Sequence, residues 1–154
     1  VLLLAWCEDE RQLVGSCGVE ASPLTPEGRG VARAPTDHAR MAMRPLISNL
    51  VVDESYRRRG IAKRLMREAE AKARSWGYDE LLLKVEEGNR PAERLYAHLG
   101  YALSAEDEHA ETPQPGLWRV RWVRCTNLVM RKDLGSAPSS VQDLVSRVPL
   151  LRGL

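Results

Sequence analysis

The feature that most constrains this 154-residue chain is the stretch of residues 46–76, which reads as a buried strand, a short basic turn and a long helix. Residues 46–52 are mostly apolar and end in two valines, as expected of a buried strand. We place Glu70 and Arg74 on the solvent-facing side of the helix as an i,i+4 pair. Gly77 follows the last turn, where a helix favours a residue with positive φ. The apolar residues recur at helical spacing along one side: Ile61, Leu65, Met66, Ala69, Ala73 and Trp76.

The turn between this strand and helix indicates the chemistry. It reads Arg57-Arg58-Arg59-Gly60-Ile61-Ala62, followed by Lys63. The first N–H groups of a helix lack intrahelical partners and carry a partial positive charge. Gly60 and the small Ala62 allow an anion to approach that backbone, and the basic side chains add charge that phosphate favours. The turn therefore indicates either a diphosphate site or a solvated basic helix start.

A second motif lies downstream of the first. Residues 57–62 have the form Arg-x-x-Gly-x-Ala, and residues 89–101 have the form Asn-x-x-Ala-x-x-Leu-Tyr-x-x-x-Gly-Tyr. An apolar strand at residues 80–85 separates them. Together the two motifs resemble the signatures of the GNAT superfamily of acetyl-CoA-dependent N-acetyltransferases. The resemblance is strong over residues 46–101 and weak on the flanks, and the Trp76-Gly77-Tyr78 turn also resembles plant and algal plastid members.

The resemblance implies an α/β (α+β) fold of the GNAT type. This fold has a mixed, mostly antiparallel twisted sheet with a parallel, splayed central strand pair and flanking helices. Residues 1–134 would form the acetyltransferase domain, and residues 135–154 a linker with a short amphipathic tail at 141–148. The family usually begins with a strand and two helices that help form the acceptor groove. We expect this N-terminal part to be missing before the hairpin at residues 1–19.

Local patterns predict the remaining elements. Residues 1–7 and 12–19 predict paired strands, with a bulge near Gly15 or Gly18. Residues 80–85 form a nearly continuous apolar run, which is typical of a strand covered on both faces. The next helix begins at Asn89 or Arg90 and ends before Gly100. The alternation of residues 117–124 predicts a strand, and residues 128–131 predict either another strand or its continuation past a kink at Thr126-Asn127. We expect a mobile connection at 21–45 and a polar, acidic loop at 105–116.

The resemblance also implies roles in binding acetyl-CoA. The backbone of Leu50, Val51 and Val52 would pair with the pantetheine arm, because its amides need hydrogen-bond partners. Asn89, with Arg90 and Pro91 beside it, would contact the cofactor from the adjacent strand end; the alternative is that Asn89 is only a helix cap. The pyrophosphate would be held at the helix start by Arg57, Arg58, Arg59, Gly60, Ile61, Ala62 and Lys63.

Tyr96 is the implied proton donor to the departing thiolate. A thiol pKa of about 8.5 and a phenol pKa of about 10 make that transfer reasonable. The alternative is a core tyrosine whose hydroxyl is satisfied. Family members resembling N-terminal acetyltransferases often carry Glu or His in the L-x-V motif of the fifth strand, which here reads Leu83-Lys84-Val85. A charged lysine cannot accept a proton without a large drop in pKa. Glu86, on the same side of the strand, is the substitute base we name, and a water chain is the alternative.

The activity implied is acetyl transfer by direct attack in a ternary complex. The acceptor is expected to be a protein N-terminal α-amine or a lysine, which the acidic segment at 105–116 would attract if it is more than a solubilising surface. One alternative is a small amine such as a polyamine or an aminoglycoside. Another is a non-catalytic acetyl-CoA-binding module that needs a partner subunit. Homodimerisation also fits.

Composition and residue spacing bear on nucleic-acid, membrane and metal binding and on the cellular compartment. The 23 Lys and Arg residues nearly balance the 21 Asp and Glu residues, so no nucleic-acid-binding surface is implied. The sequence holds no long apolar run, so no membrane partner is expected. His38 has no potential ligand at metal spacing, and we expect no metal. Three cysteines without metal spacing indicate a reducing intracellular compartment, either the chloroplast or the cytoplasm.

Overall fold

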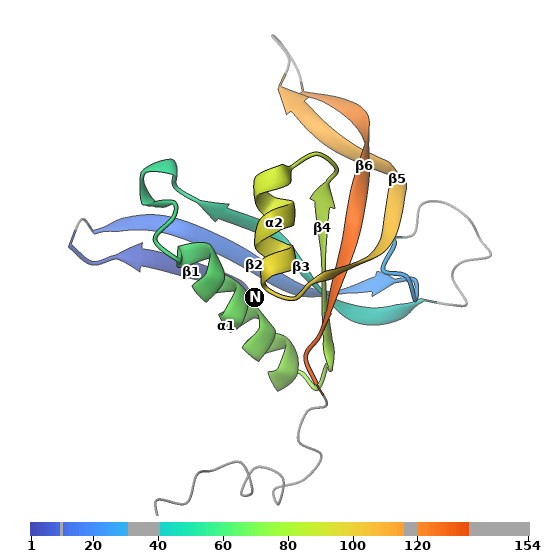
Figure 1. The fold of residues 1–154 in the computed structure, drawn as a ribbon, viewed down its shortest axis with the longest axis horizontal. Coiled ribbons are helices and arrows are strands. Elements are labelled where there is room, and N and C mark those ends of the chain that lie inside the picture. Colours follow the sequence, from blue (N-terminus) through green and yellow to red (C-terminus); the bar gives the residue numbers. More distant parts are fainter. Residues whose placement is uncertain (10, 31–40, 116–119, 136–154) are drawn as a thin grey trace, which may run out of the picture.

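The computed structural model describes residues 1–9, 11–30, 41–115 and 120–135. In this part, six strands form one mixed sheet in the order β1-β2-β3-β4-β6-β5. Helices α1 and α2 lie in front of the sheet (Figure 1). The elements are β1 (Leu2–Cys7), β2 (Gln12–Leu24), β3 (Ala42–Val52), the 3₁₀ helix η2 (Glu54–Tyr56), α1 (Ile61–Ser75), β4 (Glu80–Glu86), α2 (Arg90–His98), β5 (Ala102–Pro115) and β6 (Val120–Asp133). A mixed sheet with one parallel pair, β3 and β4, confirms the predicted fold class.

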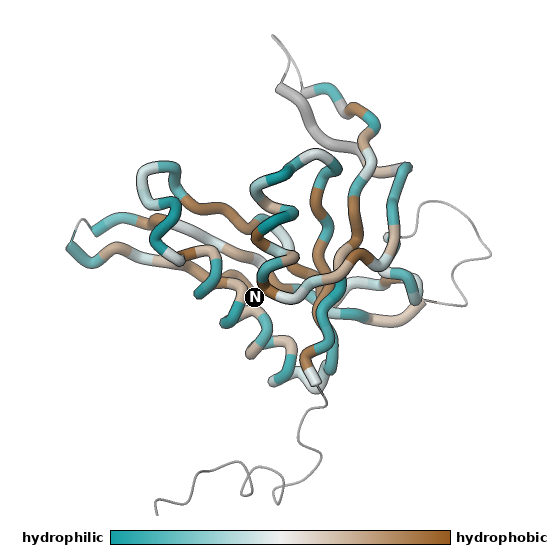
Figure 2. The backbone as a smooth tube through the Cα atoms, in the orientation of Figure 1, coloured by the Kyte–Doolittle hydropathy of each residue, from teal (hydrophilic) through white to brown (hydrophobic). Residues whose placement is uncertain are grey.

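The core lies on both faces of β4, as its continuous apolar run predicted. Figure 2 shows the hydrophobic residues concentrated along the central strands. Leu81 and Leu83 pack with both helices in the main cluster, whereas Leu82 points to the other face and packs with Leu24 and Val129. The chain beyond β2 covers this second face so closely that a Cβ at Gly28 would clash with Leu82. Part of the predicted mobile connection is therefore packed structure.

The parallel pair is short because β3 bends away from β4. The two strands are in register at Leu46 with Leu82 and at Ile47 with Leu83, and then they part. Just beyond, Asn49 has φ 51°, and the register between β2 and β3 slips. A bulge was predicted near Gly15 or Gly18 on β2. The register slip lies beside these glycines, but the extra residue is on β3. A bulge of this kind bends its strand, and the bend opens the sheet between β3 and β4.

One expectation about the C-terminal half is wrong. Residues 105–116 were expected to form a loop, but they extend β5 to Pro115, and β6 runs without a break from Val120 to Asp133. Their pairing explains the difference, because ladder hydrogen bonds to a neighbouring strand override a polar composition on an exposed edge. The irregularities lie on β5 instead, between Leu103 and Ala105 and between Asp107 and Ala110.

Glu70 also differs from expectation. It is only 6% exposed, although the helical pattern placed it on the solvent-facing side. Its carboxylate lies 2.7 Å from the ammonium of Lys132 on β6, and the Arg74 guanidinium is farther away at 4.0 Å. Residues 31–40, 117–119 and the tail at 141–148 lie outside the described residues, so the division of the chain near residue 134 stays a prediction.

The described cysteines are unpaired thiols; Cys17 is buried, and Cys7 and Cys125 are half-buried. Over the described ranges, no helix combines the length and apolar character needed to cross a bilayer.

Candidate active site

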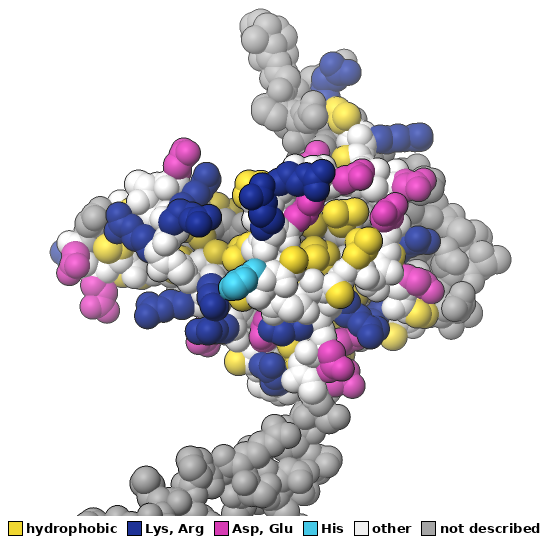
Figure 3. Space-filling view, in the orientation of Figure 1, with side chains coloured by type: hydrophobic (Ala, Val, Ile, Leu, Met, Phe, Trp, Pro, Cys, Tyr) yellow, Lys and Arg dark blue, Asp and Glu magenta, His cyan; other side chains and the backbone are white. Residues whose placement is uncertain are grey.

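A pocket of about 610 Å³ lies where β3 and β4 part. It is bounded by the end of β3, the turn into α1 and the first two turns of α2. Figure 3 shows Lys and Arg side chains gathered on both sides of this hollow, with apolar side chains between them. The lining residues are Leu50, Val51, Val52, Tyr56, Arg57, Arg58, Gly60, Ile61, Ala62, Lys63, Asn89, Pro91, Ala92, Leu95 and Tyr96. The fold thus brings both sequence motifs to one cavity.

The turn into α1 exposes backbone N–H groups to this pocket. Arg58 has φ 64° and Gly60 has φ 81°, so the chain turns sharply before the helix. The first helical bond runs from the Arg64 N–H to the Gly60 carbonyl at 3.1 Å, and no side chain caps the helix. Within the described chain, the N–H groups of residues 58–63 donate to no protein acceptor. Such a set of donors at a helix N-terminus suits a phosphate group.

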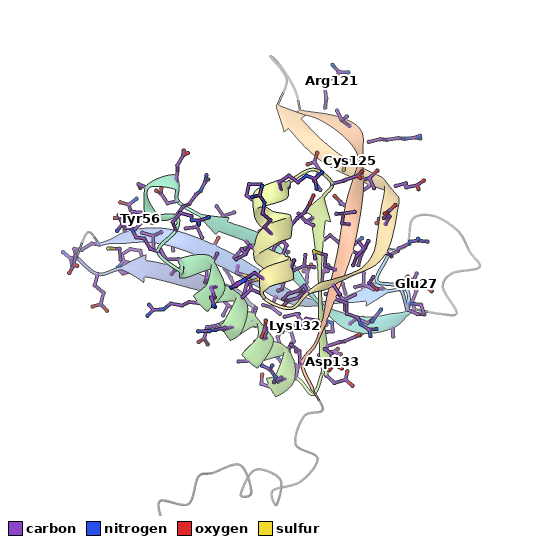
Figure 4. All side chains as sticks on the ribbon, in the orientation of Figure 1. Glu27, Tyr56, Arg121, Cys125, Lys132 and Asp133 are labelled. Carbon is purple, nitrogen blue, oxygen red and sulfur yellow. The ribbon has the colours of Figure 1, made fainter. Side chains whose placement is uncertain are left out.

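The three arginines of the turn are not equivalent. Arg57 donates from Nε to the Val52 carbonyl at 3.3 Å and lines the pocket together with Arg58. Arg59 turns away, donates to the Ser55 carbonyl at 3.2 Å and lies 4.8 Å from the centre of the Tyr56 ring. Figure 4 labels Tyr56 beside this turn. The Arg59 side chain therefore secures the turn and leaves the pocket to Arg57, Arg58 and Lys63.

Asp53 and Ser55 fix the start of this turn. The Ser55 hydroxyl and its N–H both donate to the Asp53 carboxylate, the N–H at 2.9 Å. These hydrogen bonds lower the pKa of Asp53, with a further contribution from the charge of Arg57. The carboxylate stays ionised at neutral pH and holds η2 in place.

The start of α2 forms the opposite side of the pocket. The Asn89 Oδ1 accepts from the Ala92 N–H at 3.4 Å, so Asn89 caps the helix and lines the pocket at the same time. The cap and the ligand-contact alternatives are therefore compatible. Pro91 also lines the pocket, whereas the Arg90 side chain forms an ion pair with Glu93 at 3.4 Å and is not among the lining residues.

Tyr96 lines the pocket and is 8% exposed. Among the described residues, none forms a hydrogen bond with its hydroxyl, which remains available to a ligand. Burial raises the pKa of Tyr96, and the nearby Cys17 thiol raises it further. Burial likewise raises the pKa of Cys17 to about 11, so Cys17 is a neutral thiol at physiological pH. Tyr96 therefore keeps its proton until a more basic group arrives.

Lys84 and Glu86 lie on the face of the sheet opposite the helices, since they alternate with the core residues of β4. The Lys84 ammonium is 3.0 Å from the Asp107 carboxylate, an ion pair that sequence reasoning missed. Glu86 is exposed, and its register partner on the neighbouring strand β6 is Asn127. Burial raises the pKa of Cys125, and the charges of Glu86 and Asp107 raise it further. Figure 4 shows Cys125 beside the end of β4.

Three lining residues were not predicted as site residues: Tyr56, Ala92 and Leu95. Ala92 and Leu95 belong to the second motif and were assigned only to the inner face of α2. Tyr56 is a buried aromatic residue in an otherwise charged segment. That contrast was the available signal, because an apolar ring in such a segment has to pack against something.

A scan against family models matches residues 2–101 to the acetyltransferase (GNAT) family. The chain belongs to this family. The resemblance inferred from the two motifs is therefore confirmed. No group of acidic, His or Cys side chains suited to a metal ion occurs in the described ranges.

Relatives of this GNAT chain include a protein named GCN5-related N-acetyltransferase 4, chloroplastic, from Arabidopsis thaliana. It is 42% identical over 69 residues, which are 45% of this chain and 24% of that protein. This chain thus matches about a quarter of that relative's length.

Solved structures share the fold. Naa20 from Chaetomium thermophilum, in complex with a bisubstrate analogue, has a TM-score of 0.64 at 17% identity, covering 94% of this chain and 68% of its own. The ribosomal-protein-alanine N-acetyltransferase from Brucella melitensis has a TM-score of 0.55 at 23% identity, covering 86% and 68%.

Proposed function

We propose that this chain transfers an acetyl group from acetyl-CoA to a protein amine, either an N-terminal α-amine or a lysine. The observation that carries the proposal is one pocket whose lining holds both the helix start with its unpaired N–H groups and Tyr96, whose hydroxyl no described residue bonds. The helix start suits a pyrophosphate, and the phenol suits a thiolate that needs a proton. Leu50, Val51 and Val52 of the bent end of β3 line the same pocket.

Different residues of the chain take different roles in the proposed acetyl transfer. When bound, acetyl-CoA supplies the acetyl thioester. The acceptor nitrogen forms a bond to the carbonyl carbon as the carbon–sulfur bond breaks, and Tyr96 gives its phenolic proton to the leaving sulfur. The nitrogen loses its extra proton to Glu86 or to a water chain. An α-amine has a pKa of about 7.7–8.0 and barely needs this help, whereas a lysine, at about 10.4, depends on it.

A protein acceptor is favoured by the surface around Asp107. A second hollow, of about 520 Å³, is lined by Arg29 and residues 103–108, of which Glu106, Asp107 and Glu108 are acidic. It lies along β5 and includes Asp107, which pairs with Lys84 of β4, and its acidic side chains suit a cationic peptide. The name of the Brucella protein likewise describes a ribosomal protein as the acceptor.

Turnover on a peptide library, compared with polyamines and aminoglycosides, tests this acceptor class. Acetylated peptides detected by mass spectrometry are the expected result. Acetylation confined to small amines would refute the protein acceptor and leave the acetyltransferase.

One observation favours a second candidate, a module that binds acetyl-CoA without catalysis. The ion pair between Lys84 and Asp107 occupies the strand position from which a base would act. Tight acetyl-CoA binding by calorimetry, without turnover of any amine by the full-length protein, would establish this alternative. Light scattering of the same sample would show whether a second copy or a partner subunit is needed.

We also infer a chloroplast location. It is supported by the name of the Arabidopsis relative, which is chloroplastic, and by the resemblance of the core motif to plastid members. A fluorescent fusion of the full-length protein tests it, and a signal confined to the cytoplasm would refute it.

A further inference from the structure

A buried polar chain runs behind the active site from β6 through α1 to the end of α2. The Glu70 Oε1 accepts from the Lys132 ammonium at 2.7 Å and from the Tyr101 hydroxyl at 3.5 Å. Glu70 and Tyr101 are only 6% and 3% exposed. Figure 4 shows Lys132 beside the two helices. Well-packed apolar residues often stabilise a core as well as a buried ion pair does, so stability alone does not account for these charges.

Tyr101 is held through its ring and through its backbone. Glu70 accepts from its hydroxyl, and the Lys132 ammonium lies 5.6 Å from the ring centre. The Tyr101 N–H donates to the Tyr96 carbonyl at 3.0 Å and fixes the main chain from which the ring extends. These contacts come from three different elements and together restrict the position of the ring.

Tyr101 in turn packs against Tyr96. Their ring centres are 6.2 Å apart with an angle of 63° between the planes, an edge-to-face arrangement. Because no described residue bonds to the Tyr96 hydroxyl, its direction is set by packing around its ring. Tyr101 is the aromatic partner in that packing.

We propose that Glu70, held by Lys132, is a positioning residue that fixes Tyr101 and, through it, directs the Tyr96 hydroxyl into the pocket. The inference rests on the proposed role of Tyr96 as proton donor. A tyrosine that must meet a sulfur atom loses rate when its ring tilts by a small amount, whereas cofactor binding depends on groups elsewhere in the pocket. The chain should therefore affect turnover and leave affinity unchanged.

The test uses Tyr101→Phe, which removes one hydroxyl and keeps the ring. We expect kcat to fall about tenfold, a fraction of the effect of general acid catalysis, with an unchanged KM for acetyl-CoA. The matched control is Glu80→Gln, which breaks another buried ion pair, with Arg44 at 2.6 Å, at the far end of β4. This control should lose at least as much stability and keep kcat.

Two further variants separate positioning from stability. Glu70→Gln leaves Lys132 unpaired, and adding Lys132→Met should recover much of the lost stability without recovering kcat. In a Tyr96→Phe background, Tyr101→Phe should cause no additional loss, because it acts only through Tyr96. The proposal would be overturned if Lys132→Met restored kcat together with stability. It would also be overturned if Glu80→Gln lowered kcat as much as Tyr101→Phe does, or if the kcat losses of Tyr101→Phe and Tyr96→Phe were fully additive.

A measurement without turnover keeps this inference separate from the proposed function. In protein labelled with ¹³C-tyrosine, the Tyr96 ring resonances should shift in Tyr101→Phe and in Glu70→Gln but not in Glu80→Gln. If the wild-type protein acetylates nothing while the resonances shift as expected, the proposed function fails and the positioning stands. If the resonances do not move, the positioning fails whatever the activity.

Discussion

Tyr96→Phe separates proton donation from cofactor binding. The substitution keeps the ring, its edge contact with Tyr101 and the shape of the pocket. The lost hydroxyl makes no hydrogen bond with any described residue, so the variant gives up none of the roughly 1 kcal/mol that such a bond contributes. The free energy of unfolding and the Kd for acetyl-CoA should therefore be unchanged. General acid catalysis contributes about 10²–10⁴-fold, so kcat should fall by that factor, or about 3–5 kcal/mol in transition-state stabilisation.

The assay follows release of the CoA thiol with a chromogenic disulfide at saturating acceptor, beside calorimetry for acetyl-CoA and urea unfolding. The wild-type kcat should also decline at alkaline pH as Tyr96 loses its proton. Because burial raises the pKa of Tyr96, this decline belongs above the ordinary tyrosine value of about 10. The Tyr96→Phe variant should lack this alkaline decline in kcat. An unchanged kcat would remove Tyr96 from the mechanism, and a lost affinity would show that its hydroxyl serves binding.

Three further predictions concern the helix start, the base and the buried thiol. Gly60→Glu should abolish acetyl-CoA binding in calorimetry, because it places a carboxylate where phosphate would bind and strains a residue at φ 81°; Gly60→Asn, which tolerates that φ, should retain much of the affinity. Glu86→Gln should lower turnover of a lysine peptide more than that of an α-amine peptide, with Glu87→Gln as the neighbouring control, and equal turnover of all variants would favour the water chain. The free energy of unfolding should hold up to about pH 9 and then fall toward pH 11, because Cys17 deprotonates in the unfolded chain before it does in the folded one, and Cys17→Ala should reduce that fall.

The short-range parts of this fold could be predicted from the sequence because their causes are local. The helical stripe from Ile61, the positive φ of Gly77 and the Asn89 cap are each determined by a few neighbouring residues, and the structure has all three. The two motifs also anticipated most of the pocket lining. Local pattern and final structure agree wherever no distant segment competes.

The missed features depend on partners far away in the chain. Glu70 forms the predicted i,i+4 ion pair with Arg74 at 4.0 Å, but it lies closer to Lys132, 62 residues away, because the fold brings the end of β6 beside α1. Residues 105–115 look like a loop until β6 supplies the ladder partner. Lys84 likewise finds Asp107 only through the sheet. Helical or strand periodicity depends on neighbouring residues only, so it cannot predict such distant partners.

The geometry of the site follows from the single parallel pair. In parallel neighbours the carboxyl ends of both strands lie at the same edge of the sheet, and here each strand leads into a helix that starts there. Two helix N-termini therefore converge on the gap that the Asn49 bulge opens. One start leaves its amides bare, while the other is capped by Asn89 and carries Tyr96 two turns along. Antiparallel pairing of β3 with β4 would place the two helix N-termini at opposite edges of the sheet, and one acetyl-CoA molecule could not contact both.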